Sequence, residues 1–266
     1  MKIISVCSFK GGTAKTSISL NVGAAFARLH QKRVLMVDFD AQANLTAGFG
    51  FDPDHHDSLA AVLQDNKDLS EVILSTNHPL IDLIPADTWL ERVETTAPLS
   101  SDRYSHEKLK KVVSALDYDL IIVDTPPSLC WLTESALIAC THALICATPE
   151  FYSIKGLQRL SYFMDYIGKR HPFDLLGVAL SFWNPRGKNN ADFLSVIEET
   201  FPGKVLQTKV RRDVAVSEAA IHGKPVFISR PKSRAAEDYL ALAQELFNQM
   251  TLSQNEPFPC LSPTLF

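Results

Sequence analysis

The sequence has no apolar run long enough to cross a membrane, although 46% of its 266 residues are hydrophobic. The apolar segment at its start, KIISVCSF, is short and is followed at once by Lys10, so it does not fit a secretory signal. Charged residues make up 21% of the chain, a share typical of an ordered globular protein. We therefore expect a cytoplasmic protein with a sizeable core.

Paired cysteines are also lacking. The five cysteines are an odd number and include no C-x-x-C pair, which argues against a disulfide framework and against a thiolate metal site. We expect them to act as small apolar residues in strands and helices. They are Cys7, Cys130, Cys140, Cys146 and Cys260.

No composition break, linker or internal repeat divides the sequence. We therefore expect one domain over residues 1–252. The remaining residues, 253–266, contain three prolines and no cation, and we expect a flexible C-terminal tail there.

Short apolar runs alternate with amphipathic segments along the chain. Most of these runs are continuously apolar, as strands covered on both faces are. The pattern predicts an α/β fold with three layers, in which helices flank both faces of a mostly parallel sheet. The predicted strands are 3–8, 33–38, 80–86, 120–124, 142–148, 175–182 and 204–210, and the predicted helices are 16–29, 105–116, 131–139, 153–170, 189–200 and 233–250.

The sequence SFKGGTAKT, from Ser8 to Thr16, joins the first predicted strand to the first predicted helix. Such a glycine-containing loop directs backbone N–H groups and the positive end of a helix dipole toward one point, which makes an anion site. Lys15 followed by Thr16 matches the end of a phosphate-binding loop, with the ammonium on the outer phosphates and the hydroxyl on Mg²⁺. The predicted ATP-binding residues of this loop are Lys10, Gly11, Gly12, Thr13, Ala14, Lys15, Thr16 and Ser17.

Three acids end predicted strands. Asp38 and Asp40 follow the second strand, and Asp124 ends the apolar run LIIVD. Ligands of open α/β sheets bind at the carboxyl ends of strands, so these acids are expected near the loop. We expect Thr16, Asp38 and Asp124 to support Mg²⁺.

Five motifs together resemble the ParA/Soj-type partition ATPases of the ParA/MinD deviant Walker A P-loop superfamily. In chain order they are KGGTAKT, VDFDAQAN, YDLIIVDTPPSL, CATPEFYSIKGLQRL and VRRDVAVSEAAIHGKPV. The resemblance extends from Lys2 to about Leu246. It implies a P-loop NTPase fold and a Mg²⁺-dependent ATPase with weak intrinsic activity.

The resemblance also explains why one loop carries two lysines. In this family the earlier lysine contacts the phosphates bound by the partner in a dimer that encloses two nucleotides. By this likeness Lys10 acts in trans and Lys15 in cis, and Asp40 positions or activates the attacking water. Lys10, Lys15 and Asp40 are thus the predicted catalytic residues.

The sequence departs from the family pattern at several positions. Ala14 stands where the family most often has glycine, which is tolerable at negative φ and costly at positive φ. Arg211 replaces a proline of the late signature, and Ala215 replaces an arginine with a DNA role. Asn184 resembles the residue that recognises the adenine edge. Arg212, the arginine of the late signature, is expected at both the nucleotide and DNA.

The resemblance implies non-specific binding of double-stranded DNA by the ATP-bound homodimer. Between Lys204 and Arg234 lie eight cations and two acids, in a chain whose net charge is −4, and this uneven distribution favours a surface that faces a polyanion. The predicted DNA-binding residues are Arg186, Lys188, Lys204, Lys209, Arg211, Arg212, Arg230, Lys232 and Arg234.

The resemblance implies two further properties. A ParB-like centromere-binding protein would stimulate hydrolysis, and the protein would be nucleoid-associated while it segregates a plasmid or chromosome. The chain begins at its first predicted strand, so a helix-turn-helix domain is not expected before it.

Two alternatives within the same fold remain open. A MinD-like membrane-associated ATPase requires a C-terminal amphipathic helix with flanking cations, which residues 253–266 do not provide. A small-molecule enzyme similar to dethiobiotin synthetase would not need the in-trans lysine, and the sequence offers no separate substrate motif for it.

Overall fold

A computed structural model describes residues 1–64, 66–97, 104–150 and 153–252. The predicted tail, residues 253–266, lies outside the described residues, and so does Cys260. Among the described helices, none is both long enough and apolar enough to cross a bilayer.

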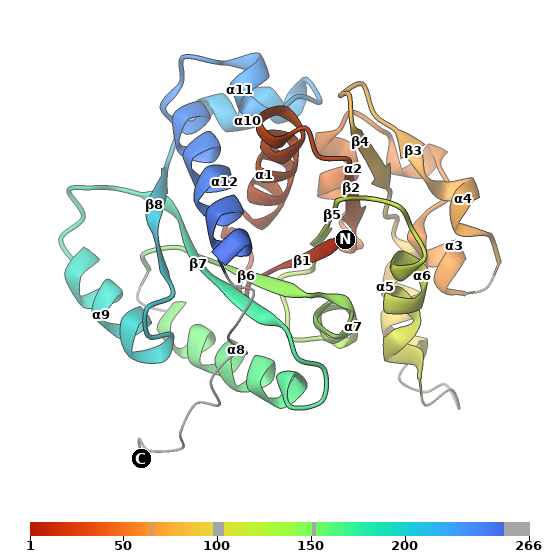
Figure 1. The fold of residues 1–266 in the computed structure, drawn as a ribbon, viewed down its shortest axis with the longest axis horizontal. Coiled ribbons are helices and arrows are strands. Elements are labelled where there is room, and N and C mark those ends of the chain that lie inside the picture. The colour runs from red at the N-terminus through yellow and green to blue at the C-terminus, as the bar shows by residue number, and fades with distance from the viewer. Residues whose placement is uncertain (65, 98–103, 151–152, 253–266) are drawn as a thin grey trace.

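Eight strands form one sheet in the order β3-β4-β2-β5-β1-β6-β7-β8 (Figure 1). All neighbouring pairs are parallel except β3 and β4, which are antiparallel. The mostly parallel sheet predicted from the apolar runs is thus confirmed. The strands are β1 (Lys2–Cys7), β2 (Val34–Asp38), β3 (Leu74–Ser75), β4 (Ile81–Ile84), β5 (Leu120–Asp124), β6 (His142–Ala147), β7 (Asp174–Trp183) and β8 (Val205–Arg211).

Helices cover both faces of the sheet, so the predicted three layers are confirmed (Figure 1). One core cluster joins the sheet to α7 and α8, and the other joins it to α1 and α12. The helices are α1 (Lys15–His30), α2 (Asn44–Gly48), α3 (Leu59–Leu63), α4 (Leu69–Val72), α5 (Trp89–Thr96), α6 (Lys108–Ser114), α7 (Trp131–Ala139), α8 (Ser153–Gly168), α9 (Asn190–Thr200), α10 (Val214–Ile221), α11 (Val226–Ser229) and α12 (Arg234–Leu252), with 3-10 turns at Pro53–His55 and Ser105–Glu107.

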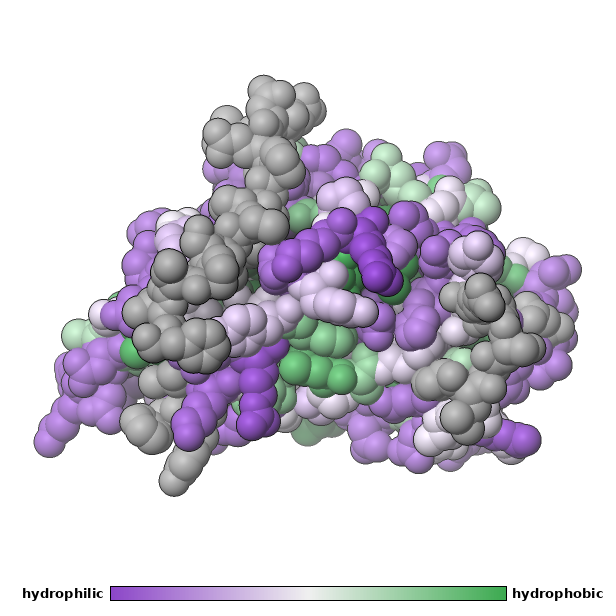
Figure 2. Space-filling model, turned by 90° about the horizontal axis from the view of Figure 1, so that it is seen from below, coloured by the Kyte–Doolittle hydropathy of each residue, from purple (hydrophilic) through white to green (hydrophobic). Residues whose placement is uncertain are grey.

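The central strands are continuously apolar because both of their faces are buried. Every residue of β5 is buried, and so is every residue of β2 and β6. Most large apolar side chains lie inside, and Figure 2 shows a molecular face that is largely hydrophilic, with a smaller hydrophobic area near its centre.

Candidate nucleotide-binding site

The loop between β1 and α1 lies at the carboxyl edge of the sheet, beside the ends of β2 and β5. β1 ends at Cys7 and α1 begins at Lys15. Between them, Gly12 has φ +73° and Ala14 has φ +58°, so the chain turns sharply before the helix starts. This geometry aims the first turn of α1 at the loop's concave side, as expected for a phosphate-binding loop.

Ala14 adopts the left-handed conformation, with φ 58° and ψ 26°. A side chain at Cβ crowds the following carbonyl oxygen there, which costs about 1–2 kcal/mol relative to an ordinary conformation. Alanine at this position therefore costs stability relative to glycine.

Hydroxyl groups hold the shape of the loop. Ser8 donates a hydrogen bond from Oγ to the carbonyl oxygen of Lys10, at 2.9 Å. Ser181 of β7 is fully buried and donates from Oγ to the carbonyl oxygen of Thr13, at 2.7 Å. Sequence reasoning missed Ser181, because nothing in its neighbourhood marks a partner 168 residues away.

Asp124 receives two hydroxyl groups from α1. Thr16 donates from Oγ1 to Oδ2 at 2.7 Å, and Ser19 donates from Oγ to Oδ1 at 2.8 Å. The carboxyl group is fully buried, and this burial raises its pKa, while nearby Lys15 and the two hydroxyl groups lower it. Lys15, with 7% of its surface exposed, thus lies where it can offset the carboxylate charge.

Asp38 lies beside Asp124, because β2 and β5 pair in a register that places the two acids opposite each other. Oδ2 of Asp38 accepts two hydrogen bonds from Thr46 in α2, from the backbone N and from Oγ1, each at 2.8 Å. Burial, together with the charge of Asp124, raises the pKa of Asp38 to about 7. Asp38 therefore links α2 to the end of β2 through these two hydrogen bonds.

Asp40 is also buried, with 8% of its surface exposed. Its Oδ1 accepts a hydrogen bond from the backbone N of Gln42 at 3.1 Å, and its own N–H donates to Oδ1 of Asp38 at 3.3 Å. The three acids predicted to serve one cluster are thus brought together at the carboxyl edge.

Lys10 points in a different direction from Lys15. Its side chain is 39% exposed, and its ammonium pairs with the carboxylate of Glu150, which follows β6. The two lysines of the loop therefore have different environments, one buried beside Asp124 and one at the surface.

The oxygen ligands gathered here fit Mg²⁺, which prefers carboxylates, hydroxyls and water. Within the described part of the chain, no group of three or more His, Cys, Asp or Glu side chains is arranged to hold a metal ion by itself. A Mg²⁺ ion bound here would take most of its ligands from phosphate and water, and Thr16 and Asp124 are the residues that would support it.

Comparisons with known proteins identify the family. A family model described as an AAA domain matches residues 1–175. A ParA family protein of Chlamydia muridarum is 65% identical over 248 residues, which cover 92% of this chain and 97% of that protein. The sporulation initiation inhibitor protein Soj of Bacillus subtilis is 36% identical over 250 residues, which cover 92% of this chain and 98% of Soj. This chain belongs to the ParA family.

A solved structure supports the same fold. The septum site-determining protein MinD of Pyrococcus horikoshii, in complex with Mg-ADP, superposes with a TM-score of 0.78 at 23% identity, and the match covers 96% of this chain and 99% of that one. The ParA family member described here therefore has the same fold as MinD.

Beside the loop of this ParA family member lies a pocket of about 260 Å³. Its lining includes Ala14, Ser17 and Tyr239 from the helical side, and Phe182 and Arg212 from the ends of β7 and β8. The guanidinium of Arg212 lies over the ring of Phe182, with 5.8 Å from Cζ to the ring centroid. The location next to Ser17 is suitable for the base of a nucleotide whose phosphates occupy the loop.

A larger cleft of about 940 Å³ opens next to it. Four arginines line this cleft, together with Gly12, Glu150 and Asn184. They are Arg186, Arg211, Arg212 and Arg234. The predicted adenine-side residue Asn184 thus shares this larger cleft with Gly12 of the loop, and it is not among the residues that line the smaller pocket beside Ser17. The same cleft brings together four of the predicted DNA-binding cations.

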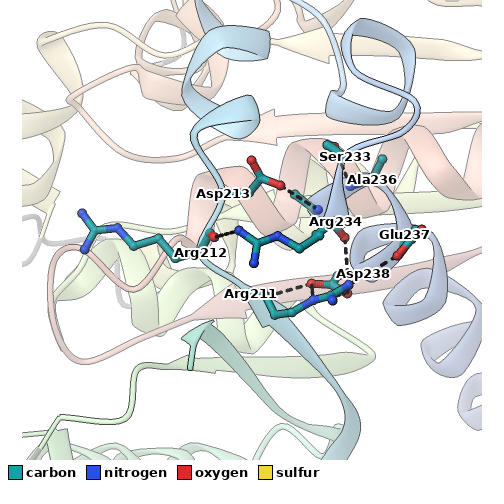
Figure 3. A network of polar contacts seen from close by, with 9 residues as sticks. Arg211, Arg212, Asp213, Ser233, Arg234, Ala236, Glu237 and Asp238 are labelled. Carbon is teal, nitrogen blue, oxygen red and sulfur yellow. Dashed lines mark hydrogen bonds and ion pairs between the residues drawn. The ribbon is translucent and has the colours of Figure 1, made fainter. Parts of the chain in front are cut away.

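Several of the predicted DNA-binding cations are held by groups of the protein itself (Figure 3). Arg211 binds the carboxylate of Asp238 through Nε at 2.9 Å and Nη2 at 2.7 Å, and Arg234 donates from Nη2 to the carbonyl oxygen of Arg212 at 3.4 Å. Arg230 pairs with Glu218 at 2.9 Å.

Other cations of this set differ in partner and position. Lys209 donates to the carbonyl oxygens of Leu206 and Gln207, and burial lowers its pKa. Lys204 lies just before β8, whereas Arg211 is the last residue of that strand, so the two lie at opposite ends of β8. Within the described ranges, five of the predicted cations have no ion pair or side-chain hydrogen bond: Arg186, Lys188, Lys204, Arg212 and Lys232.

Proposed function

We propose that this chain is a Mg²⁺-dependent DNA-partition ATPase that switches between a monomer and an ATP-bound sandwich dimer. The observation that carries the proposal is the convergence of Lys15, Thr16 and Asp124 at the start of α1, with Thr16 bonded to Asp124 at 2.7 Å. Lys15 would bind the outer phosphates, and the Thr16 hydroxyl would contact the metal. Asp40 would position the attacking water.

The second lysine supports the dimeric part of the proposal. Lys10 is at the surface, where its ammonium pairs with the exposed Glu150 and not with the buried acids of its own loop, so a second subunit could reach it. A cation supplied only on dimerisation would couple hydrolysis to assembly, because transition-state charge spreads over the phosphoryl oxygens.

The dimer would bind double-stranded DNA without sequence preference through the four-arginine cleft and neighbouring cations. A ParB-like protein would stimulate hydrolysis and release the DNA, and the protein would be cytoplasmic and nucleoid-associated while it segregates a plasmid or chromosome. Its relatives support this proposal, since Soj and the ParA family protein of Chlamydia muridarum match it over nearly their full lengths.

Size analysis with MgATP tests the switch. Wild type, Lys10→Ala and Asp40→Ala are compared by analytical ultracentrifugation at the same protein concentration. Asp40→Ala should accumulate as a dimer because it binds ATP without hydrolysing it, and Lys10→Ala should weaken the dimer. A dimer that is insensitive to both substitutions would rule out the in-trans role of Lys10.

Retardation of arbitrary duplex DNA tests the second part. Binding should need ATP and should weaken steeply when the salt concentration is tripled, because phosphate contacts release counterions. Affinity that does not change when ATP is removed would contradict a nucleotide-controlled DNA surface.

A further inference from the structure

The carboxylate that pairs with Lys10 belongs to Glu150, close after the end of β6. Glu150 follows β6, and its backbone N donates to the carbonyl oxygen of Thr148 at 2.7 Å. Its side chain is 55% exposed, and it pairs with the ammonium of Lys10 from the same subunit. The pair joins groups 140 residues apart in the sequence.

A second contact ties the same two segments together. The ring of Phe9 lies against Gly156 in α8 so closely that a Cβ built on Gly156 would be 1.5 Å from Cδ1 of Phe9. The residue before Lys10 is therefore seated on the helix that follows Glu150.

The negative charge of Glu150 lies among positive charges. This residue lines the four-arginine cleft, and among the described residues it is the one acid that does so. Lys10 thus pairs with a carboxylate that four arginines also border, and the pair neutralises that carboxylate.

We propose that Glu150 is a positioning residue that holds Lys10 within its own subunit until the ATP-bound partner arrives. The proposal rests on the in-trans role of Lys10 given above. Lys10 must leave Glu150 before it reaches the phosphates of the second subunit, so breaking the pair is part of the cost of dimerisation. The phosphates, which carry more charge than one carboxylate, then replace Glu150 as the partner of the ammonium.

The test compares Glu150→Gln with wild type in a titration of dimer formation, measured by analytical ultracentrifugation with a slowly hydrolysed ATP analogue and Mg²⁺. Glu150→Gln removes the charge and keeps the size. The dissociation constant of the dimer should fall by about two- to fivefold, the range that an exposed ion pair supplies. The gain should shrink at high salt, because screening weakens the pair in wild type.

Two further variants distinguish positioning from a general effect. Glu199→Gln in α9 removes an equally exposed carboxylate that has no ion pair in the described structure, and it should leave the dissociation constant unchanged. In the Lys10→Ala background the change Glu150→Gln should have no effect, because the residue it holds is gone. Thermal unfolding of each monomer without nucleotide shows whether the variants fold normally.

The outcomes separate this proposal from the proposed function. If Lys10→Ala weakens the dimer but Glu150→Gln leaves it unchanged or weakens it, Glu150 does not restrain Lys10 and only the positioning role fails. A gain that persists in the Lys10→Ala background would also overturn that role. If Lys10→Ala has no effect on the dimer, the in-trans assignment fails, and the role of Glu150 fails with it.

Discussion

The hydroxyl of Thr16 and the carboxylate of Asp124 are joined by a 2.7 Å hydrogen bond that connects the first turn of α1 to the end of β5. Ser19, one turn later, bonds the other oxygen of the same carboxylate at 2.8 Å. The two hydroxyls make similar contacts with Asp124, but only Thr16 lies in the first turn, where phosphate and metal would bind.

This relationship gives a matched pair of variants. Thr16→Val should lower the ATPase rate by about tenfold or more, because it removes both the metal contact and the bond to Asp124. Ser19→Ala should cost about 1 kcal/mol of unfolding free energy and keep most of the activity, because it removes only a support. Steady-state phosphate release and denaturant unfolding measure the two effects. Thr16→Ser should restore activity, and equal losses of activity in Thr16→Val and Ser19→Ala would contradict a special role for Thr16.

Substitution by glycine usually lowers the free energy of unfolding, but at Ala14 we expect it to raise it. Ala14→Gly should raise the free energy of unfolding by about 0.5–1 kcal/mol, because relief of the left-handed strain exceeds the entropy that glycine adds to the unfolded chain. Denaturant unfolding measures it. Ala191→Gly, on the exposed face of α9, is the control and should lower stability by a similar amount. Destabilisation by both variants would show that Ala14 is not strained.

Much of the fold could be predicted because its signals are local. Most of the strands are continuously apolar, although β8 contains the polar run from Gln207 to Lys209. Their alternation with helices predicts a parallel sheet. The helices and strands between β2 and β5 were harder to predict from the sequence. Its short helices, such as α3 and α4, have too few turns for a 3.6-residue period to appear, and β3 has only two residues.

The candidate site shows the same division. Lys15, Thr16 and Asp124 are marked by their places at the ends of a strand and a loop, which the sequence displays directly. Residues that the fold brings to the site from distant parts of the chain have no such signal in the sequence. Ser181 holds the loop from β7, and Glu150 holds Lys10 from beyond β6, each more than 130 residues away.

Arg211 and Arg186 were predicted for the same DNA surface, but the structure predicts different effects for them. Arg211→Ala should cost about 1–3 kcal/mol of unfolding free energy, because Asp238, whose side chain is 11% exposed, would keep only the hydrogen bond from the backbone N at position 211. Arg186→Ala should leave stability within about 0.5 kcal/mol and should weaken DNA binding at all sequences, with a salt slope reduced by about 1.

Denaturant unfolding and DNA titration at several salt concentrations measure both quantities. Lys32, which pairs with Asp119 near the opposite ends of the strands, provides the control. Lys32→Ala should change neither DNA affinity nor its salt slope. If Arg211→Ala lowered DNA affinity without loss of stability, Arg211 would be a DNA contact and its pair with Asp238 would be incidental.

His142 should make stability depend on pH. It begins β6 with its side chain 8% exposed, and Nδ1 lies 2.7 Å from Oγ1 of Thr141. Burial, aided by the charge of Lys2, lowers its pKa from 6.5 to about 4, whereas Asp174, 3.9 Å from Nε2, opposes the shift. Between about pH 6.5 and pH 4, His142 is therefore protonated in the unfolded chain but neutral in the folded chain.

The free energy of unfolding should thus fall as pH drops from 6.5 to 4, by up to about 3 kcal/mol from this residue. His142→Gln keeps a hydrogen-bonding side chain but does not titrate, so the advantage of wild type over this variant at pH 7 should shrink steadily toward pH 4. Denaturant titrations at several pH values measure the difference. His222→Gln, at an exposed position after α10, makes the same substitution away from the core and serves as the control. Parallel curves for wild type and His142→Gln would mean that His142 accepts its proton equally well in both states.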